Sequence, residues 1–343
     1  MLRILLFPFA VLYDIATRFR NHLYNIEHKR SFEFDTNVIS VGNLAVGGTG
    51  KSPMVEYLIR LLKDKYKVAT LSRGYGRRSR GFRIAGEEDS SKTLGDEPYQ
   101  FYEKFKHEVH VTVGEERALA IPQILFERED TEVIILDDAY QHRTVKPGLS
   151  ILLTEYQQPF YDDYVMPAGR LRESRRGAKR ADIVVVTKCP KDVSPDSFID
   201  YRKHIQHYTG NDTLIAFAGI KYHEPVRLFG TVEWNSRVLL FSGIAKSHLL
   251  KEYVSSNYDL IEHKVYGDHY AYSVREAEKI RDWYETHRAN DAVILTTEKD
   301  MVKLLDPEVK ALLEDLPLFY LPIETYFIDN GRAFDERVLK MVR

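Results

Sequence analysis

The chain of 343 residues carries 49 lysines and arginines against 51 aspartates and glutamates, and its net charge of −2 gives no reason to expect nucleic acid as a ligand. One cysteine cannot form an internal disulfide, which fits a reducing compartment. The apolar fraction of 44% and the charged fraction of 29% are those of an ordinary globular protein. The length is large for one hydrophobic core, so two domains are expected.

The N-terminal stretch is the most hydrophobic part of the chain. Its unbroken apolar run, Ile4 to Tyr13, is far shorter than the ~20 residues that a bilayer-spanning helix needs. A signal peptide is not expected, because no small-x-small cleavage site follows. Two interpretations stay open: a helix that lies in the membrane surface, with Arg18 and Arg20 at anionic headgroups, and a first helix packed into the core.

A phosphate-binding loop is the strongest feature of the sequence. A β-branched run from Val38 breaks into glycines, and a helix with apolar residues at helical spacing starts at Pro53. The glycines let backbone N–H groups point at phosphate oxygens, Lys51 can reach the β- and γ-phosphates, and the Ser52 hydroxyl can ligate Mg²⁺. The first motif position is Ala45 instead of glycine, a small residue that still fits. The predicted nucleotide-binding residues are Ala45, Val46, Gly47, Gly48, Thr49, Gly50, Lys51 and Ser52.

Charged residues follow two further predicted strands. The apolar run that ends in Asp137 and Asp138 is typical of a Walker B strand, whose carboxylate holds Mg²⁺; turn formation is the alternative role. The strand at 67–71 is followed by Arg73 and Tyr75, where open α/β sheets bind ligands. This position favours a second anion at the site over a merely solvated basic loop.

Two other segments are rich in charged residues, but neither indicates a function by itself. Read alone, Asp96 and Glu97 before a proline-started helix are most simply helix caps. The basic segment 170–180 is either a solvated helix face or a surface for anionic lipid. The segment T-K-C-P at 187–190 is not the N-K-x-D of a guanine-binding site, which disfavours GTP.

Strands alternate with helices along the whole chain, which predicts an α/β protein. We expect a P-loop NTPase-type parallel sheet domain and a second, smaller α/β domain. The expected divisions are an N-terminal membrane-associated helix at 1–30, the P-loop kinase domain at 31–212, and the second domain with its linker at 213–343. In a loop of that second domain, His269 stands next to Asp268, although sequence neighbours need not touch.

The motifs taken together resemble one family. They are G-N-L-A-V-G-G-T-G-K-S-P, S-R-G-Y-G, G-D-E-P, D-D-A-Y-Q-H-R, P-A-G-R-L-R-E, D-H-Y and T-T-E-K-D, in order as far as about Lys303. This set is similar to that of the tetraacyldisaccharide 4′-kinases, the lipid A 4′-kinases of Gram-negative bacteria. The resemblance implies transfer of the ATP γ-phosphate, with Mg²⁺, to the 4′-hydroxyl of a tetraacylated glucosamine disaccharide 1-phosphate.

The resemblance also implies a setting. The family acts at the cytoplasmic face of the bacterial inner membrane as a peripheral or monotopic protein. Its partners are then the lipid-linked disaccharide and the membrane surface, which the N-terminal helix contacts. No nucleic acid and no obligate protein partner are expected.

Roles carry over by motif. Asp96 resembles the general base, His269 its supporting partner, Lys51 a catalytic nucleotide contact, and Ser52, Asp137 and Asp138 the metal-associated residues. The expected substrate contacts are Asn43, Arg73, Tyr75, Gln141, Arg170, Arg172 and Glu173. Two rival functions remain: an NTPase that drives a partner, which hydrolyses ATP without an acceptor, and a non-catalytic nucleotide sensor, which tolerates Asp96→Ala.

Overall fold

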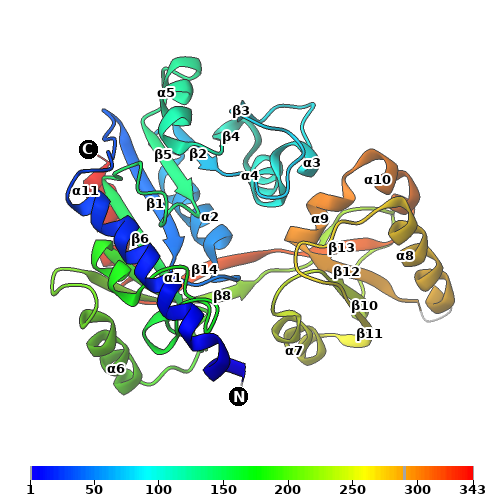
Figure 1. The fold of residues 1–343 in the computed structure, drawn as a ribbon. Helices are drawn as coiled ribbons and strands as arrows, with labels where there is room; N and C mark the ends of the chain where they lie inside the picture. The colour runs from blue at the N-terminus through cyan, green and yellow to red at the C-terminus, as the bar shows by residue number, and fades with distance from the viewer. Residues whose placement is uncertain (1, 289–290, 343) are drawn as a thin grey trace.

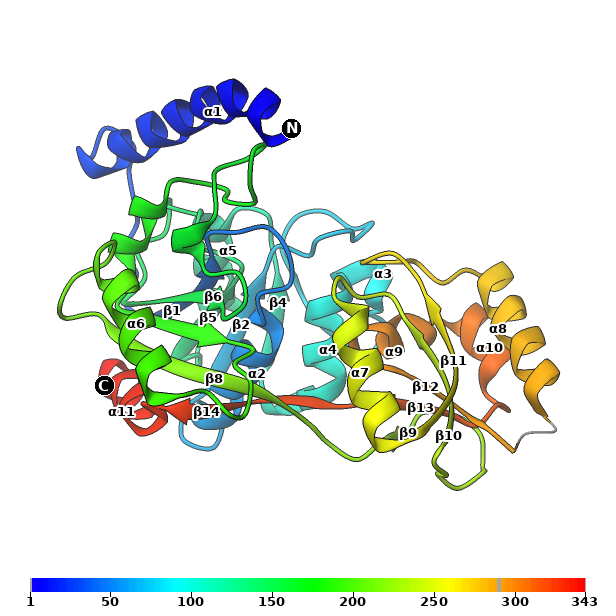
Figure 2. The same ribbon diagram turned by 90° about the horizontal axis from the view of Figure 1, so that it is seen from below.

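The computed structural model describes residues 2–288 and 291–342, which fold into two α/β units joined by long strands (Figures 1 and 2). In these ranges nine strands form the large sheet, in the order β14-β8-β7-β6-β1-β5-β2-β4-β3. The strands are β1 Asn37–Asn43, β2 Val68–Ser72, β3 Arg83–Ile84, β4 His110–Val113, β5 Val133–Asp137, β6 Leu149–Glu155, β7 Ile183–Thr187, β8 Leu214–Tyr222 and β14 Ile323–Asp329.

The central strands of this sheet are parallel, from β4 through β2, β5, β1, β6 and β7 to β8. Strands β5 and β7 are buried along their whole length, as expected for parallel strands that are covered on both faces. The helices of this unit are α2 Lys51–Leu62, α3 Ser91–Leu94, α4 Asp96–Phe105, α5 Arg117–Glu127, α6 Pro195–Gln206 and α11 Gly331–Met341, with 3₁₀ turns at Lys106–Glu108, Phe160–Asp162 and Arg175–Arg180.

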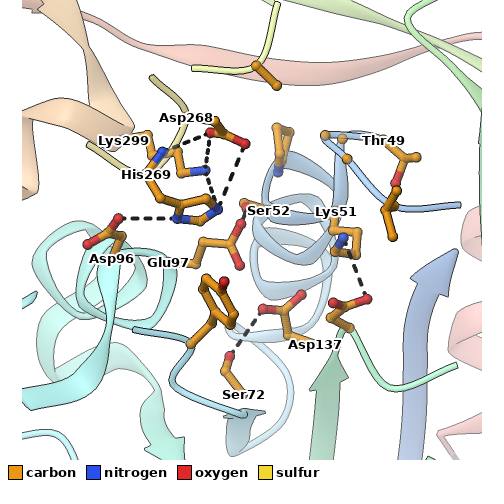
Figure 3. Close-up of a pocket in the computed structure, with 18 of the residues that line it drawn as sticks. Thr49, Lys51, Ser52, Ser72, Asp96, Glu97, Asp137, Asp268, His269 and Lys299 are labelled. Atoms are coloured by element: carbon orange, nitrogen blue, oxygen red, sulfur yellow. Dashed lines mark hydrogen bonds and ion pairs between the residues drawn. The ribbon is translucent and has the colours of Figure 1, made fainter. Parts of the chain in front are cut away.

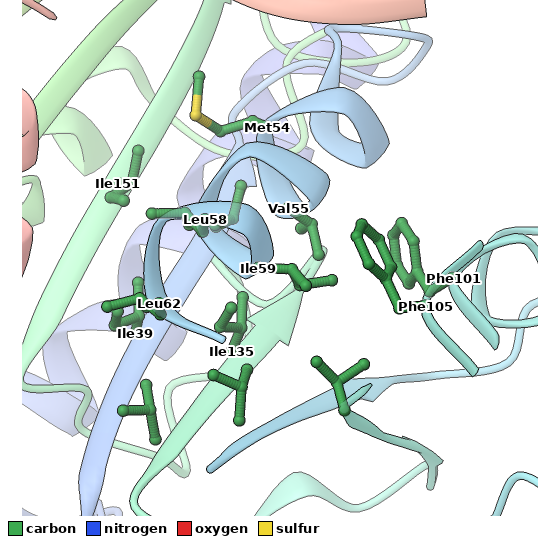
Figure 4. Packing of buried hydrophobic residues seen from close by; sticks show 14 of the residues in the cluster. Ile39, Met54, Val55, Leu58, Ile59, Leu62, Phe101, Phe105, Ile135 and Ile151 are labelled. Carbon is green, nitrogen blue, oxygen red and sulfur yellow. The ribbon is translucent and has the colours of Figure 1, made fainter. Parts of the chain in front are cut away.

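Helix α2 anchors the core beneath the phosphate-binding loop (Figure 4). Its apolar residues recur at helical spacing and pack against the sheet on one side and against α4 on the other. The packed residues include Met54, Val55, Leu58, Ile59 and Leu62 of α2, Ile39, Ile135 and Ile151 of the sheet, and Phe101 and Phe105 of α4. One core therefore fixes both the loop that precedes α2 and the start of α4.

The second unit contains a five-stranded sheet in the order β11-β10-β12-β13-β9. Its strands are β9 Val226–Arg227, β10 Arg237–Ser242, β11 Asp259–Val265, β12 Val293–Thr297 and β13 Leu318–Leu321, and its helices are α7 Ser247–Asn257, α8 Val274–His287, α9 Glu298–Leu304 and α10 Pro307–Leu313. The pairs β10–β11, β10–β12 and β12–β13 are parallel. The expectation of an α/β fold with a second, smaller α/β domain is confirmed.

Two strands beyond residue 212 belong to the large sheet, which corrects the expected domain boundary at that residue. Strands β8 and β14 pair with each other in the large sheet, although both lie in the range 213–343. The chain leaves the first unit through β8, builds the second sheet between residues 226 and 321, and returns through β14 (Figure 2). Apolar patterning identifies a strand but not the sheet it joins, so the sequence could not reveal this return.

Helix α1, Leu2–Asn25, lies across one face of the first unit (Figures 1 and 2). Large apolar side chains along it are exposed, with Leu5 at 66%, Phe9 at 62% and Leu12 at 66%. These exposures contradict the interpretation of α1 as a core-packed first helix. Within the described ranges, no helix combines the length and apolarity that crossing a bilayer requires.

Candidate active site

The phosphate-binding loop joins β1 to α2 and is braced from inside. Gly47 and Gly50 adopt φ values of 107° and 83°, a region that side chains disfavour. Asn43 Nδ2 donates to Thr49 Oγ1 at 2.6 Å, and Thr187 Oγ1 donates to the Thr49 carbonyl at 2.9 Å. These hydrogen bonds hold the loop from β1 and β7.

Lys51 lies at the first position of α2 and faces the end of β5. Its Nζ is 3.5 Å from Asp138 Oδ1, and Arg172 Nη1 donates to both carboxylate oxygens of Asp138 at 3.0 and 3.1 Å. Burial opposes ionisation of Asp138, yet Lys51 and Arg172 together hold its pKa below the ordinary value. Asp138 therefore orients Lys51.

The surroundings of Asp137 raise its pKa, whereas those of Asp138 lower it. Ser72 Oγ donates to Asp137 Oδ2 at 3.2 Å, whereas the buried Oδ1 has no hydrogen-bond partner. Burial, followed by repulsion from Glu97 and Asp138, raises the pKa of Asp137 to about 7. An unpaired buried carboxylate oxygen at the end of a P-loop sheet fits a cation ligand.

Glu97 completes this corner of the site. Ser52 Oγ donates to Glu97 Oε1 at 3.2 Å, and both side chains lie beside Asp137 (Figure 3). The oxygens of Ser52, Glu97 and Asp137 are hard ligands of the kind that Mg²⁺ prefers. In the described part of the chain, no three His, Cys, Asp or Glu side chains are grouped to hold a metal by themselves.

From the sequence, Glu97 is expected only as a helix cap, and its contact with Ser52 is not foreseen. A usable signal was its place beside Asp96 in G-D-E-P, because the first turn of a helix can direct adjacent carboxylates into one cavity. Asp96 itself starts α4, and its Oδ2 lies 3.4 Å from His269 Nδ1 (Figure 3). Lys303 Nζ lies 3.9 Å from the same oxygen. The fold thus brings a loop of the second unit to a helix of the first.

One cavity of about 1120 Å³ contains these groups. Its walls come from both units and from α1, and include Tyr13, Thr17, Arg20, Tyr24, the loop Val46–Ser52, Arg73, Tyr75, Asp96, Glu97, Asp137, Asp138, Gln141, Arg172, Lys188, Lys246, Asp268, His269 and Lys299. Four of the expected substrate contacts, Arg73, Tyr75, Gln141 and Arg172, are among them.

The other expected contacts do not line this cavity. Asn43 is fully buried against Thr49, and the buried Glu173 is paired with Arg180 Nη2 at 2.8 Å. Arg170 Nε donates to Asp163 Oδ2 at 2.9 Å. Ala45, expected at the nucleotide, instead forms a β-bridge with Leu171. The geometry gives these residues supporting positions, because their polar atoms or backbone are already engaged with neighbouring segments.

Helix α1 is tied to the cavity wall by hydrogen bonds. Asn21 Nδ2 donates to Glu173 Oε2 at 2.6 Å, and Tyr13 OH donates to the Arg172 carbonyl at 3.1 Å. Arg143 Nη1 donates to the Asn21 carbonyl at 2.8 Å. The arginine-rich segment 170–180 is therefore not a solvated helix face, since several of its side chains and one carbonyl make these and other internal contacts.

A buried carboxylate that no sequence motif indicates lies behind the phosphate-binding loop. Glu155 accepts from Lys188 Nζ at 2.6 Å and from Lys246 Nζ of the second unit at 2.8 Å. Burial opposes ionisation, but the two ammonium groups keep the pKa of Glu155 below its ordinary value. Lys188 also donates to the Gly48 carbonyl. Glu155 thus connects the second unit to the phosphate-binding loop.

Glu155→Gln is expected to lower the free energy of unfolding by about 3 kcal/mol, because it leaves two lysines of a buried network without their counter-charge. Urea unfolding followed by circular dichroism measures the change. The matched control is Glu33→Gln, which breaks an exposed ion pair with Lys146 and should leave the free energy of unfolding nearly unchanged. Equal losses in the two variants would contradict the role of Glu155.

The raised pKa of Asp137 predicts a pH dependence of stability without nucleotide. The folded state holds a proton at Asp137 up to a pKa of about 7, whereas the unfolded chain releases it near the ordinary value of 3.8. Stability of the nucleotide-free protein therefore falls as pH rises through this window. Asp137→Asn lacks this loss of stability. Its melting temperature, relative to that of the wild type, should therefore rise between pH 5 and pH 8. Parallel melting curves would contradict the assignment.

The parallel sheet with its phosphate-binding loop and the second α/β unit define a P-loop protein of two α/β units. The family model described as Tetraacyldisaccharide-1-P 4′-kinase matches residues 2–343. The chain belongs to the tetraacyldisaccharide 4′-kinase family, which confirms the resemblance found in its motifs.

Curated relatives and a solved structure agree. The chain is 44% identical to a tetraacyldisaccharide 4′-kinase of Flavobacterium johnsoniae, covering 100% of this chain and 98% of the relative. It is 40% identical to that of Bacteroides thetaiotaomicron, covering 98% and 93%. The crystal structure of LpxK from Aquifex aeolicus in complex with ATP is similar at a TM-score of 0.78, with 30% identity and 100% coverage of both chains.

Proposed function

We propose that this chain transfers the γ-phosphate of ATP to the 4′-hydroxyl of a tetraacylated glucosamine disaccharide 1-phosphate, a step of lipid A biosynthesis. Family membership supports the reaction. The observation that carries it is the single cavity that joins the phosphate-binding loop, the Asp96–His269 pair and α1. A lipid-linked acceptor explains why the site of a kinase reaches a helix with exposed apolar side chains.

The nucleotide half of the site holds the phosphates. The backbone N–H groups of Gly50, Lys51 and Ser52 would donate to the phosphate oxygens, whereas the N–H of Val46 donates to the Arg170 carbonyl at 2.8 Å. Lys51, held in place by Asp138, would place its positive charge on the β- and γ-phosphates. Ser52, Asp137 and Glu97 would hold Mg²⁺. When bound, Mg²⁺ neutralises the charge of the phosphates during transfer.

The acceptor half supplies the base. Asp96 accepts the proton of the 4′-hydroxyl as the hydroxyl oxygen attacks the γ-phosphate in line. His269 orients the Asp96 carboxylate, with Nδ1 3.4 Å from Oδ2. Asp96 belongs to the first unit and His269 to the second. Closure of the two units therefore completes the Asp96–His269 pair and excludes water that would hydrolyse ATP. A crosslink that holds the units apart without loss of turnover would contradict this closure.

The remaining cavity wall receives the disaccharide. Arg73 and Arg172 are cations, and Tyr75 and Gln141 are hydrogen-bonding side chains suited to a phosphorylated sugar. Asn43, Arg170 and Glu173 support this wall from behind. We assign the apolar side chains of α1 to the cytoplasmic surface of the inner membrane, to which the protein attaches peripherally.

Transfer of labelled γ-phosphate from ATP to a detergent-dispersed tetraacylated disaccharide 1-phosphate tests the function. The wild type is expected to label the lipid, and Asp96→Ala to bind nucleotide without labelling it. ATP consumption with no labelled lipid would favour the partner-driving NTPase. Nucleotide binding with neither hydrolysis nor transfer would favour the non-catalytic sensor.

A further inference from the structure

Lys299 touches the imidazole that supports the base, yet none of the roles assigned so far uses it. It is the second residue of α9, and its Nζ lies 3.1 Å from His269 Nε2 and 3.2 Å from Asp268 Oδ1 (Figure 3). The backbone N–H of His269 also donates to Asp268 Oδ1, at 3.1 Å. Lys299 therefore contacts both residues of the loop that delivers the imidazole to Asp96.

The contact fixes which ring nitrogen carries the proton. A lysine ammonium group offers only hydrogen-bond donors, so its partner atom, His269 Nε2, must be unprotonated. In a neutral imidazole the proton then lies on Nδ1, which faces Asp96 Oδ2 at 3.4 Å. Lys299 thus donates to Nε2 of His269, and the protonated Nδ1 of the same ring faces Asp96.

Without the ammonium group, the loop favours the other tautomer. Asp268 Oδ2 lies 4.0 Å from His269 Nε2 and is a carboxylate that attracts a proton to that nitrogen. A proton on Nε2 would leave Nδ1 as a lone pair that faces the Asp96 carboxylate, which is repulsive. Lys299 neutralises Asp268 and occupies the acceptor position of Nε2, so it opposes this arrangement.

The other neighbours of the imidazole do not select a tautomer. The Tyr75 ring meets the His269 ring edge-on at 5.5 Å between centroids. Lys303 lies 3.9 Å from Asp96 Oδ2 and is held by Asp300 Oδ1 at 2.9 Å. Lys303 thus acts on the carboxylate, and Lys299 is the residue that acts on the ring.

We propose that Lys299 is a positioning residue that keeps His269 in its Nδ1–H tautomer, so that His269 donates to one oxygen of Asp96 and leaves the other for the acceptor hydroxyl. The inference deepens the proposed kinase function and rests on it for its catalytic consequence. The tautomer itself is a property of the protein alone and can be measured without substrate.

The test is a long-range ¹H–¹⁵N spectrum of the full chain labelled with ¹⁵N-histidine, at a pH where the imidazole is neutral. His269→Gln assigns the signals by removing one pair. The wild type is expected to give a protonated Nδ1 and an unprotonated Nε2, Lys299→Met to reverse this pattern, and Lys299→Arg to restore it. A wild type with protonated Nε2, or a Lys299→Met protein that keeps Nδ1–H, would overturn the proposal.

Lys104→Met is the matched control. Lys104 also bridges the two units, between Glu56 and Glu298 at 2.7 Å each, but does not contact His269. The Lys104→Met variant should leave the tautomer of His269 unchanged. A changed tautomer in this control would mean that any loss of an ion pair between the two units disturbs the imidazole.

Lys299→Met should also lower kcat about 10-fold or more at unchanged KM for ATP, as expected for an impaired base. Absence of lipid labelling by the wild type would overturn the kinase function and leave the tautomer result intact.

Discussion

Asp96→Asn is expected to lower kcat for lipid phosphorylation by about 10²- to 10⁴-fold, the usual contribution of a general base. The amide keeps the shape of the carboxylate but cannot take up the proton of the attacking hydroxyl. The KM for ATP should change little, because Asp96 contacts His269 and Lys303 and not the phosphate-binding loop. Steady-state transfer of labelled phosphate to the lipid acceptor measures both constants.

The control for this variant is Glu103→Gln on the same helix. Glu103 pairs with Lys106 at 3.2 Å and does not line the cavity, so its loss should leave turnover within about 2-fold of the wild type, as for other surface ion pairs. Nucleotide binding by both proteins, followed with a fluorescent ATP analogue, verifies that the site remains folded. If Asp96→Asn kept more than a tenth of the wild-type kcat, Asp96 would not be the base.

Lys51→Met should reduce kcat by about 10³-fold, the cost of removing a preorganised charge that stabilises the transition state. It should also weaken ATP binding, since the same charge faces the ground-state phosphates. Asp138 would keep Arg172 as its partner at 3.0 Å, so the fold of the site should survive. Transfer assays and ATP titrations separate the two effects.

Lys63→Met serves as the comparison, because Lys63 follows the last residue of the same helix and pairs with the exposed Glu108. It should behave as the wild type in both assays. A Lys51→Met protein with full turnover would remove the phosphate-binding loop from the mechanism. Loss of ATP binding with unchanged kcat at saturation would restrict Lys51 to ground-state binding.

Expectations that rest on interactions between near neighbours in the chain agree with the structure, whereas those that depend on distant strand pairing do not. The strand expected at 67–71 is β2, one residue further along the chain, and the helix expected from Pro53 is α2, which begins at Lys51, because apolar period and capping residues are local signals. The range expected for the second domain and its linker, 213–343, includes β8 and β14 of the large sheet, because pairing between residues about a hundred positions apart leaves no trace in either strand.

Contiguous residues are enough to identify the phosphate-binding loop, the carboxylates at the end of β5, the α/β class and the family, since near neighbours set the backbone conformation of each. The contact of Glu97 with Ser52, the burial of Asp137 with an unpaired oxygen, and the contact of Lys299 with His269 exist only in the folded protein. These properties depend on which distant segments pack together and exclude water, and packing of that kind is determined by the whole chain.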